Sequence, residues 1–231
     1  MAHTARESRK EIPKMSGSLL AVFDFDGVLF DDKRFKRDYE SLFLHAGVSQ
    51  EKYEATYVQI KKQGHYDARI HIKLAVHGLK AASVREKNLF ARVIEFTKRS
   101  HDYIYADVPD FLRFLGDKEI RAILLSTGDT GFQSQKISKS GIGDLFDEVI
   151  IIPDASKVSA LKALIRREQP SSVMFIDDKK EEVEEIKASL PSIYVVQMRR
   201  RETQLPARNV VSVKNFSGLI DFVEEWKRLQ Q

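Results

Sequence analysis

The sequence contains no cysteine, which excludes disulfide bonds, thiol catalysis and thiolate metal sites. It has no apolar run near the roughly 20 residues that a membrane-spanning helix needs. The net charge of +4 is too small to indicate nucleic-acid binding, although it would favour an anionic substrate. Residues 1–18 are polar and mildly basic, so we expect a flexible tail there and no secretory signal. These absences predict a cytoplasmic protein without a membrane partner, and nucleic acid is not the partner we expect.

What is present is an ordinary globular composition. The 231 residues are 42% hydrophobic and 31% charged, enough for one substantial core and a smaller second unit. An apolar run predicts a strand over residues 19–24, buried on both faces as in a parallel sheet. The further predicted strands are 120–126, 149–152, 173–177 and 193–197. They alternate with predicted helices over 107–116, 131–140, 157–167, 181–190 and 217–229. This alternation predicts an α/β fold with a parallel sheet covered on both faces.

Residues 34–101 follow a different pattern, with apolar side chains at helical spacing, and predict an insertion of about four helices. Ser83 with Glu86 predicts a capping box at the start of the last of these helices. We therefore divide the chain into a tail (1–18), an α/β core (19–33 and 102–231) and a helical insertion (34–101).

Chemistry-bearing side chains follow three of the predicted strands and begin one helix. The segments are Asp24-Phe25-Asp26-Gly27, Ser126-Thr127-Gly128 and Asp177-Asp178 at the strand ends, and Lys157 at the helix start. Because ligand and catalytic groups lie at the carboxyl ends of parallel strands, we expect these residues to meet at one edge. They offer a carboxylate nucleophile, a second carboxylate for proton transfer, a hydroxyl donor, a cation and carboxylates for a metal.

Charge also favours a metal at this edge. The four aspartates carry three or four negative charges, depending on whether Asp26 is protonated, and Lys157 returns only one positive charge. Like charges about 4 Å apart repel by roughly 4 kcal/mol at an effective dielectric constant near 20. A divalent cation such as Mg²⁺, which prefers hard oxygen ligands, would relieve this repulsion.

These segments, in this order, resemble the four motifs of the haloacid dehalogenase-like (HAD) superfamily. The first motif is matched by residues 24–31, the second by Ser126-Thr127-Gly128, the third by Lys157 and the fourth by Asp177-Asp178. Four motifs, each at or just after the end of its own strand, are a specific signal. The resemblance covers residues 19–231. It implies a Rossmann-like three-layer core with parallel strand order 3-2-1-4-5, and an α-helical cap formed by the insertion.

The resemblance also implies Mg²⁺-dependent hydrolysis of a small phosphate monoester through an aspartyl-phosphate intermediate. Asp24 would attack phosphorus, and Asp26 would protonate the leaving oxygen and later deprotonate the attacking water. The phosphate-binding residues would be Ser126, Thr127, Gly128 and Lys157. The metal ligands would be Asp24, the backbone carbonyl of Asp26 and Asp178, with Asp177 either binding directly or orienting the site.

Asp26 distinguishes among the chemistries of this family. By analogy, dehalogenases release a halide that needs no acid and lack an aspartate at this position, so Asp26 favours phosphoryl transfer. Phosphatases and phosphomutases both keep it, so transfer to a sugar phosphate is an alternative to hydrolysis. A phosphatase acting on nucleic-acid ends and a non-catalytic phospholigand-binding module are further alternatives. The partner we expect is a small phosphorylated metabolite.

Other polar residues have a simpler structural interpretation. The run Met198-Arg199-Arg200-Arg201 predicts a solvated loop after the last strand. On the insertion, His65 and Arg69 are candidates for contacting a leaving group, with ordinary helix-surface roles as the alternative. Lys162 is a rival to Lys157, but its position inside the helix favours Lys157, which begins that helix.

Overall fold

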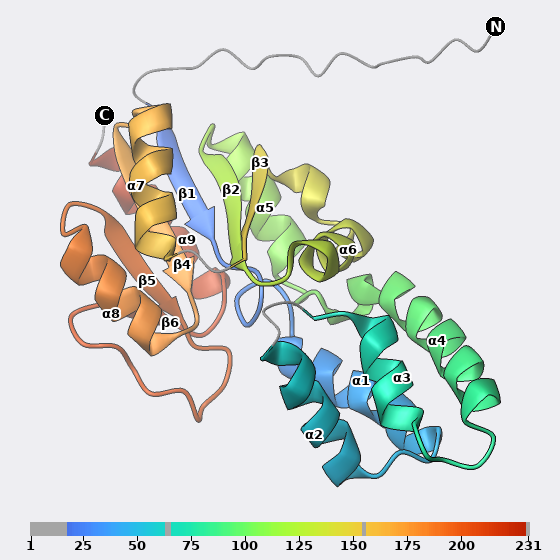
Figure 1. Cartoon of the computed structure of the whole chain (residues 1–231). Coiled ribbons are helices and arrows are strands. Elements are labelled where there is room, and N and C mark those ends of the chain that lie inside the picture. Colours follow the sequence, from blue (N-terminus) through green and yellow to red (C-terminus); the bar gives the residue numbers. More distant parts are fainter. Residues whose placement is uncertain (1–17, 63–65, 154–155, 230–231) are drawn as a thin grey trace, which may run out of the picture.

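The computed structural model describes residues 18–62, 66–153 and 156–229, so the predicted tail, apart from Ser18, lies outside the described residues. Six parallel strands in this part of the chain form one sheet of order β3-β2-β1-β4-β5-β6 (Figure 1). The strands are β1 (Leu19–Phe23), β2 (Arg121–Thr127), β3 (Glu148–Ile152), β4 (Ser172–Asp177), β5 (Tyr194–Met198) and β6 (Val211–Val213). The first five confirm the predicted parallel order. The sequence prediction omits β6, because three partly exposed residues form too short a pattern.

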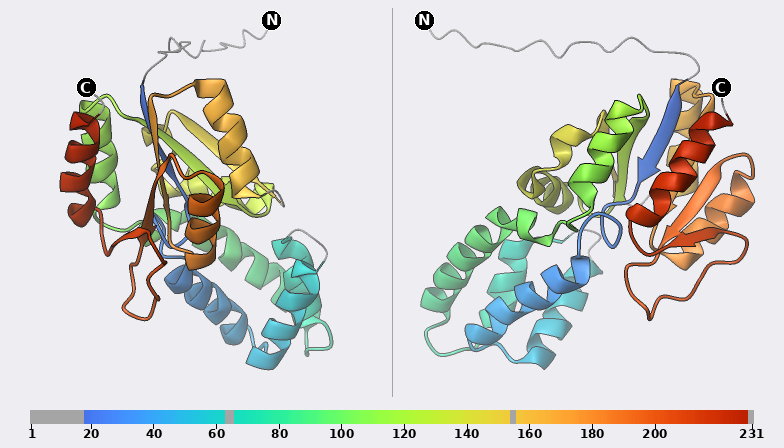
Figure 2. Two further views of the ribbon diagram at one scale, coloured as in Figure 1. Left: turned by 90° about the vertical axis from the view of Figure 1, so that its left-hand side faces the viewer. Right: turned by 180° about the vertical axis from the view of Figure 1, so that it is seen from behind.

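Helices cover both faces of the sheet and confirm the predicted three-layer architecture (Figure 2). One layer holds α5 (Val108–Asp117), α6 (Thr130–Ser140) and α9 (Ser217–Arg228), and the other holds α7 (Lys157–Glu168) and α8 (Lys180–Ser189). A short 3₁₀ turn, η2 (Gly143–Leu145), precedes β3. Side chains of β1 alternate between the layers, with Ala21 and Phe23 in one core and Leu20 and Val22 in the other. Since every residue of β1 is buried, this strand appears in the sequence as a continuous apolar run.

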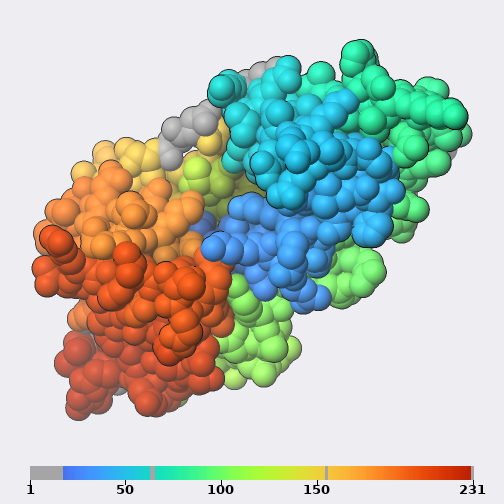
Figure 3. Space-filling model, turned by 90° about the horizontal axis from the view of Figure 1, so that it is seen from below, coloured from blue at the N-terminus to red at the C-terminus, as the bar shows by residue number. Residues whose placement is uncertain are grey.

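A helical cap lies beyond the carboxyl ends of the strands (Figure 1). We use this name for α1 (Asp32–His45), α2 (Gln50–Lys61), α3 (Ala68–Val76) and α4 (Ala82–Lys98). The cap has its own apolar core, which includes Phe43, Tyr53, Ile72 and Leu89. In Figure 3 the blue residues of α1 adjoin the orange residues of the last third of the chain. None of the helices in the described ranges has the length and apolarity required to cross a bilayer.

The predicted capping box at Ser83 and Glu86 is wrong. The α4 helix begins at Ala82, after Ala81 in the left-handed conformation (φ 55°), and no side chain caps it. Arg85 instead ties this turn to its surroundings by donating to the backbone carbonyls of Lys80 (2.9 Å) and Ala46. Tertiary contacts to the end of α1 therefore outweigh the local capping preference.

The two segments that connect the cap to the core pair through one antiparallel bridge, between Phe30 and Ile104. The backbone N–H of Asp31 donates to the carbonyl of Tyr103 (2.8 Å), the last residue of the 3₁₀ helix η1 (Ser100–Tyr103). The backbone N–H of Tyr105 donates to the carbonyl of Leu29 (3.1 Å). Phe30 packs its ring against Tyr103 between these bonds. The cap therefore begins and ends beside the residues that follow β1, where the predicted site lies.

The basic run after β5 is not a solvated loop, which corrects the sequence interpretation. The guanidinium of Arg200 is only 7% exposed and donates to both carboxylate oxygens of Asp107 (2.9 and 2.8 Å). It also donates to the carbonyl of Val28 (2.9 and 3.1 Å) and covers the ring of Tyr105. The same Asp107 carboxylate accepts the backbone N–H of Phe216 (2.8 Å). One arginine thus holds the loop after β1 against the starts of α5 and α9.

We expect Arg200→Ala to lower the free energy of unfolding by about 3 kcal/mol, because it removes one partner of a largely buried ion pair. Chemical denaturation monitored by circular dichroism measures this loss. Arg208→Ala, at an exposed position of the same loop, is the matched control and should change stability by less than about 0.5 kcal/mol. Equal effects of the two substitutions would contradict the anchoring role of Arg200.

Candidate active site

The structure brings the sequence-predicted residues together at the carboxyl edge of the sheet. Asp24 and Asp26 follow β1, and Ser126 and Thr127 end β2 with Gly128 directly after them. Asp177 ends β4 and is followed by Asp178, while Lys157 is the first residue of α7. Because β1 lies between β2 and β4, these strand ends are neighbours in space although they lie far apart in the sequence.

Lys157 is the buried cation of the site. Its side chain is 1% exposed, and its Nζ lies 3.0 Å from Asp24 Oδ1 while donating to Asp177 Oδ2. Burial alone would lower the pKa of Lys157, but the two facing carboxylates outweigh it and raise the pKa above its ordinary value. Lys162, the rival considered from the sequence, is exposed on α7. Of these two lysines, Lys157 is the one that contacts the aspartates at the strand ends.

Three carboxylates gather beside this lysine. Oxygen atoms of Asp24, Asp177 and Asp178 lie within 4.8 Å of one another. Burial raises the pKa of Asp24 to about 7, with the negative charge of Asp177 adding to this effect and Lys157 opposing it. Burial and the charge of Asp177 also raise the pKa of Asp178 to about 6. A crowded set of hard oxygen donors fits a divalent cation such as Mg²⁺.

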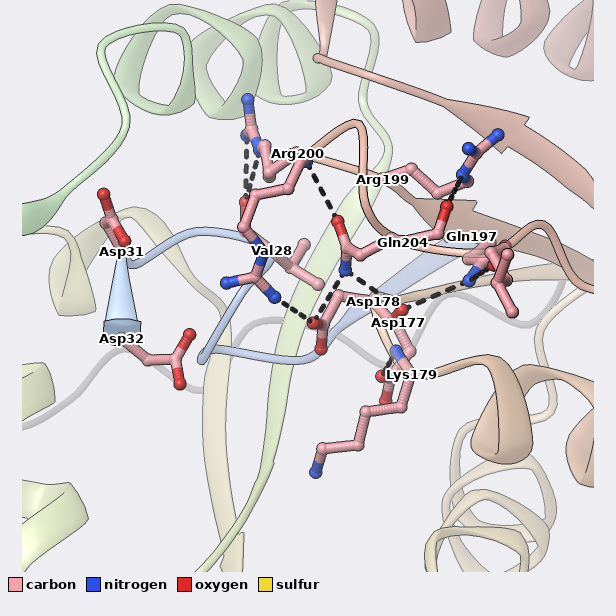
Figure 4. A network of polar contacts seen from close by, with 12 residues as sticks. Val28, Asp31, Asp32, Asp177, Asp178, Lys179, Gln197, Arg199, Arg200 and Gln204 are labelled. Carbon is pink, nitrogen blue, oxygen red and sulfur yellow. Dashed lines mark hydrogen bonds and ion pairs between the residues drawn. The ribbon is translucent and has the colours of Figure 1, made fainter. Parts of the chain in front are cut away.

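The two aspartates after β4 have different partners. Both oxygens of Asp177 are engaged, Oδ2 by Lys157 and Oδ1 by the backbone N–H of Lys179 (2.9 Å). Asp178 Oδ2 accepts from Gln204 Nε2 at 3.1 Å, and Gln204 reaches it from the loop after β5 (Figure 4). The other carboxylate oxygen of Asp178, Oδ1, makes no hydrogen bond to any described residue. Asp178 therefore has more free ligand capacity than Asp177.

A glycine allows this carboxylate to approach the first motif. Gly27 has φ of 81°, and a Cβ atom there would lie 2.5 Å from the Cγ of Asp178. Any side chain at position 27 would displace Asp178, in addition to the strain of a positive φ. The glycine of the first motif thus makes room for the fourth motif.

Asp26 lies apart from this cluster and has its own cation. Its Oδ1 accepts from Lys136 Nζ at 2.5 Å, and its Oδ2 accepts from Gln133 Nε2 at 3.0 Å. Burial would raise the pKa of Asp26, but the charge and hydrogen bond of Lys136 outweigh it and lower the pKa. Lys136 is itself 4% exposed, and its Nζ lies 4.7 Å from the ring centroid of Phe30. Asp26 and Asp24 therefore occupy electrostatically different environments.

Gln133 and Lys136 are not among the residues predicted from the sequence. They lie three residues apart on α6, so they share the face that points to the site. The sequence offers one local indication that these residues belong to the site. They are two polar residues three apart on the helix that follows Ser126-Thr127-Gly128. A solvated helix face would give the same pattern. Their burial is a consequence of the packing of α6, which the sequence alone does not specify.

The residues at the end of β2 supply donors of different kinds. Ser126 Oγ accepts from Gln133 Nε2 (2.8 Å), which leaves its own proton available. Thr127 Oγ1 is buried and makes no hydrogen bond to any described residue. The N–H of Gly128 donates to the carbonyl of Ile152 (3.0 Å), so Gly128 has no free backbone donor for a ligand. Its φ of 149° is a conformation that favours glycine at this position. Thr127 lines the pocket, and its buried hydroxyl is the donor that still needs a partner.

A pocket of about 130 Å³ lies between these residues and the cap. From the core it is lined by Asp26, Thr127, Gly128 and residues of α6, and from the cap by side chains of α1 and α2 together with Tyr66. Arg69, considered from the sequence as a substrate contact, does not line this pocket, and His65 lies outside the described residues. His71 is buried in the cap, where desolvation lowers its pKa to about 4, so it is a neutral core residue.

Lys136 changes the charge balance expected from the sequence. It neutralises Asp26, so the remaining carboxylates of the site, Asp24, Asp177 and Asp178, when ionised, face Lys157 with two negative charges in excess. Arg201 lies 3.7 Å from Asp178 and offsets part of this excess from the loop after β5. The excess of negative charge that favours a divalent cation therefore remains, although it is smaller than the sequence predicts.

Comparisons with known proteins identify a matching family. Residues 19–189 match the family model described as haloacid dehalogenase-like hydrolase. A search among curated proteins finds no significant match.

Three solved structures resemble this chain at identities that demonstrate the fold alone. A Burkholderia xenovorans LB400 protein described as a haloacid dehalogenase-like hydrolase has a TM-score of 0.67 and 20% identity, covering 91% of this chain and 98% of its own. A 2-haloacid dehalogenase from Pseudomonas syringae pv. Tomato DC3000 has a TM-score of 0.65 and 16% identity, with coverage of 90% and 99%. A Thermotoga maritima protein described as a beta-phosphoglucomutase has a TM-score of 0.60 and 14% identity, also with coverage of 90% and 99%.

The raised pKa of Asp24 predicts a pH-dependent stability in metal-free protein. The folded state holds this proton more tightly than the unfolded chain, because the pKa rises from 3.8 to about 7. The resulting stabilisation is complete below pH 3.8 and is lost as the pH rises through 7, with a slope of up to about 1.4 kcal/mol per pH unit. Asp24→Asn removes the titration, so in EDTA the variant should gain stability relative to wild type across this range.

Denaturant unfolding at successive pH values measures the difference. Asp221→Asn, on an exposed position of α9, is the control and should produce no such trend. A stability difference between wild type and Asp24→Asn that does not vary with pH would contradict the raised pKa.

Proposed function

Because this chain belongs to the haloacid dehalogenase-like hydrolase family, we propose that it is a Mg²⁺-dependent phosphatase of small phosphate monoesters. One observation carries the proposal: two carboxylates near the same pocket have opposite environments. Asp24 is crowded by other acids beside Lys157, whereas Asp26 is paired with Lys136. A nucleophile and a separate proton-transfer group are the two requirements of hydrolysis through a phosphoryl-enzyme.

In the first half-reaction, a carboxylate oxygen of Asp24 attacks phosphorus and the bond from phosphorus to the ester oxygen breaks. In its protonated form, Asp26 delivers a proton to that ester oxygen, which leaves as an alcohol. The pairing with Lys136 lowers the pKa of Asp26, so this form is a strong proton donor. Asp26 then remains as a carboxylate, which the adjacent Lys136 stabilises. In the second half-reaction, this carboxylate removes a proton from the water that attacks phosphorus, and Asp24 is released.

The transferring phosphoryl group needs donors, and the end of β2 offers them. The buried hydroxyl of Thr127, which makes no hydrogen bond to any described residue, would donate to one phosphoryl oxygen, and the hydroxyl of Ser126 to another. Lys157 holds Asp24 in place and contributes positive charge beside it. These groups act on charge that develops during transfer, where buried donors are most effective.

The residues that would hold Mg²⁺ are Asp24, Asp178 and the backbone carbonyl of Asp26. The free oxygen of Asp178 supports it as a direct ligand, and the two engaged oxygens of Asp177 support an orienting role. When bound, the ion supplies positive charge that allows a phosphate dianion to approach these acids.

Some neighbours of known structure are dehalogenases, so halide release is the competing chemistry. A halide leaves without a proton, and dehalogenation therefore gives no reason to keep Asp26 between Lys136 and Gln133. Phosphotransfer to a second substrate uses the same groups as hydrolysis and differs only in the acceptor. We favour hydrolysis, for which water is the acceptor.

The test is phosphate release from 4-nitrophenyl phosphate, with chloride release from 2-chloropropionate measured in parallel. We expect Mg²⁺-dependent phosphate release that Asp24→Asn reduces by roughly three orders of magnitude or more, because the nucleophile is lost. Asp144→Asn, outside the pocket, is the control and should retain wild-type turnover. Release of chloride without release of phosphate would replace the proposal with dehalogenation.

The hydrogen bond from Gln204 to Asp178 predicts an effect on metal affinity that does not depend on turnover. Gln204→Leu should raise the dissociation constant for Mg²⁺ by roughly tenfold, because residues that orient a ligand commonly contribute this much. Isothermal titration calorimetry measures the constant directly. Gln135→Leu, at an exposed position on α6, is the matched control. Unchanged Mg²⁺ affinity in Gln204→Leu would mean that Asp178 is not a ligand or needs no orientation.

A further inference from the structure

Building on the phosphatase function proposed above, we infer that the leaving group is a single flat aromatic ring that carries an anionic substituent. The ring would lie against an aromatic wall formed by Phe132, Tyr66 and Tyr57, and the anionic group would meet Lys61 at the outer end of this wall. All four side chains line the pocket that also contains Asp26 and Thr127.

The aromatic wall runs without a break from the core to the cap. The ring centroids of Phe132 and Tyr66 are 5.1 Å apart, and those of Tyr66 and Tyr57 are 5.6 Å apart. Phe132 lies on α6 close to the end of β2, where the phosphate donors are, and Tyr57 lies on α2 of the cap. A substrate with its phosphate beside Thr127 would therefore extend along these three rings.

Other rings line the same pocket but belong to the cores. Phe35, Tyr39 and Tyr53 are almost fully buried, at 3%, 4% and 7% exposure, so their role is packing. Tyr57, Tyr66 and Phe132 are each only partly buried. Partly buried rings along one pocket leave apolar surface for a ligand, and flat aromatic groups pack best against it.

The hydroxyl of Tyr66 is committed to the interior of the cap. It lies 2.6 Å from the hydroxyl of Tyr39 and 2.8 Å from Nδ1 of His71. These bonds fix the orientation of the ring, so Tyr66 offers the pocket a ring surface rather than a hydrogen-bonding group. This favours an aromatic leaving group over a polyhydroxylated sugar, which would need polar partners along the wall.

Lys61 gives the outer end of the wall a positive charge. The other two lysines of the pocket are paired, Lys36 with Asp32 at 2.7 Å and Lys136 with Asp26 at 2.5 Å. Lys61 forms no ion pair with any residue in the described part of the chain, and its Nζ lies 6.0 Å from the ring centroid of Tyr57. A carboxylate or a second phosphate on the leaving group would complement this charge.

The volume of the pocket suits a small leaving group. About 130 Å³ is well below the roughly 300–1,000 Å³ of pockets that hold drug-sized ligands. One ring with a small substituent matches this space.

The test measures the binding of three phosphonates, whose carbon–phosphorus bond cannot be hydrolysed, to the full chain in the presence of Mg²⁺. We expect 4-carboxyphenylphosphonate to bind about fivefold more tightly than phenylphosphonate, the gain of one partly exposed ion pair. We expect phenylphosphonate to bind about fivefold more tightly than cyclohexylphosphonate, the gain from aromatic stacking. Calorimetry yields all three dissociation constants.

Two substitutions separate the two parts of the inference. Lys61→Gln should remove the advantage of the carboxylate, whereas Lys62→Gln, its exposed neighbour at the end of α2, should preserve it. Tyr57→Leu should reduce the preference for phenyl over cyclohexyl, and Tyr57→Phe should preserve it because the ring remains.

The outcomes distinguish this inference from the function on which it rests. The inference would be overturned by equal binding of all three phosphonates, or by a carboxylate advantage that survives Lys61→Gln. In either case, phosphate release from aryl esters would leave the phosphatase proposal intact. Absence of both phosphonate binding and phosphate release would overturn the proposed function, and the inference with it.

Discussion

The contact of Lys157 with Asp24 and Asp177 is the constraint on which the site depends. An ammonium group that is 1% exposed can remain charged only beside carboxylates, and these carboxylates can remain ionised only beside a cation. The contact joins the start of α7 to the ends of β1 and β4, so it also fixes the relative position of these elements. Even so, burial and crowding raise the pKa values of Asp24 and Asp178, which is the physical reason to expect a divalent ion.

A second buried lysine divides the acids into two groups with different chemistry. Lys136, supplied by α6, lowers the pKa of Asp26, whereas Asp24, two residues earlier, has a raised pKa. Both residues lie beyond the end of β1, where the chain leaves the sheet, and their side chains meet different cations. The proposed hydrolysis assigns the nucleophile to one of these environments and the proton-transfer group to the other.

The surroundings of these acids come from segments far apart in the sequence. Gln204, from the loop after β5, orients Asp178, and Arg200, from the same loop, holds the carbonyl of Val28. The cap closes the other side, where Tyr57, Tyr66 and Phe132 line the pocket. The acids thus lie at the strand ends of the core, and the far side of the pocket is lined by side chains of the cap together with Phe132 of α6.

The parallel α/β core and the helical insertion were predictable from local sequence patterns. So were the places at strand ends and a helix start of five residues, Asp24, Asp26, Lys157, Asp177 and Asp178. Continuous apolar strands and the ends at which they stop are local patterns, and a parallel sheet aligns those ends by its topology. Only the tertiary structure decided that Lys136 pairs with Asp26 and that the basic run after β5 is partly buried. A lysine or arginine has the same local pattern whether it is solvated or paired, and only the packing of distant elements distinguishes the two.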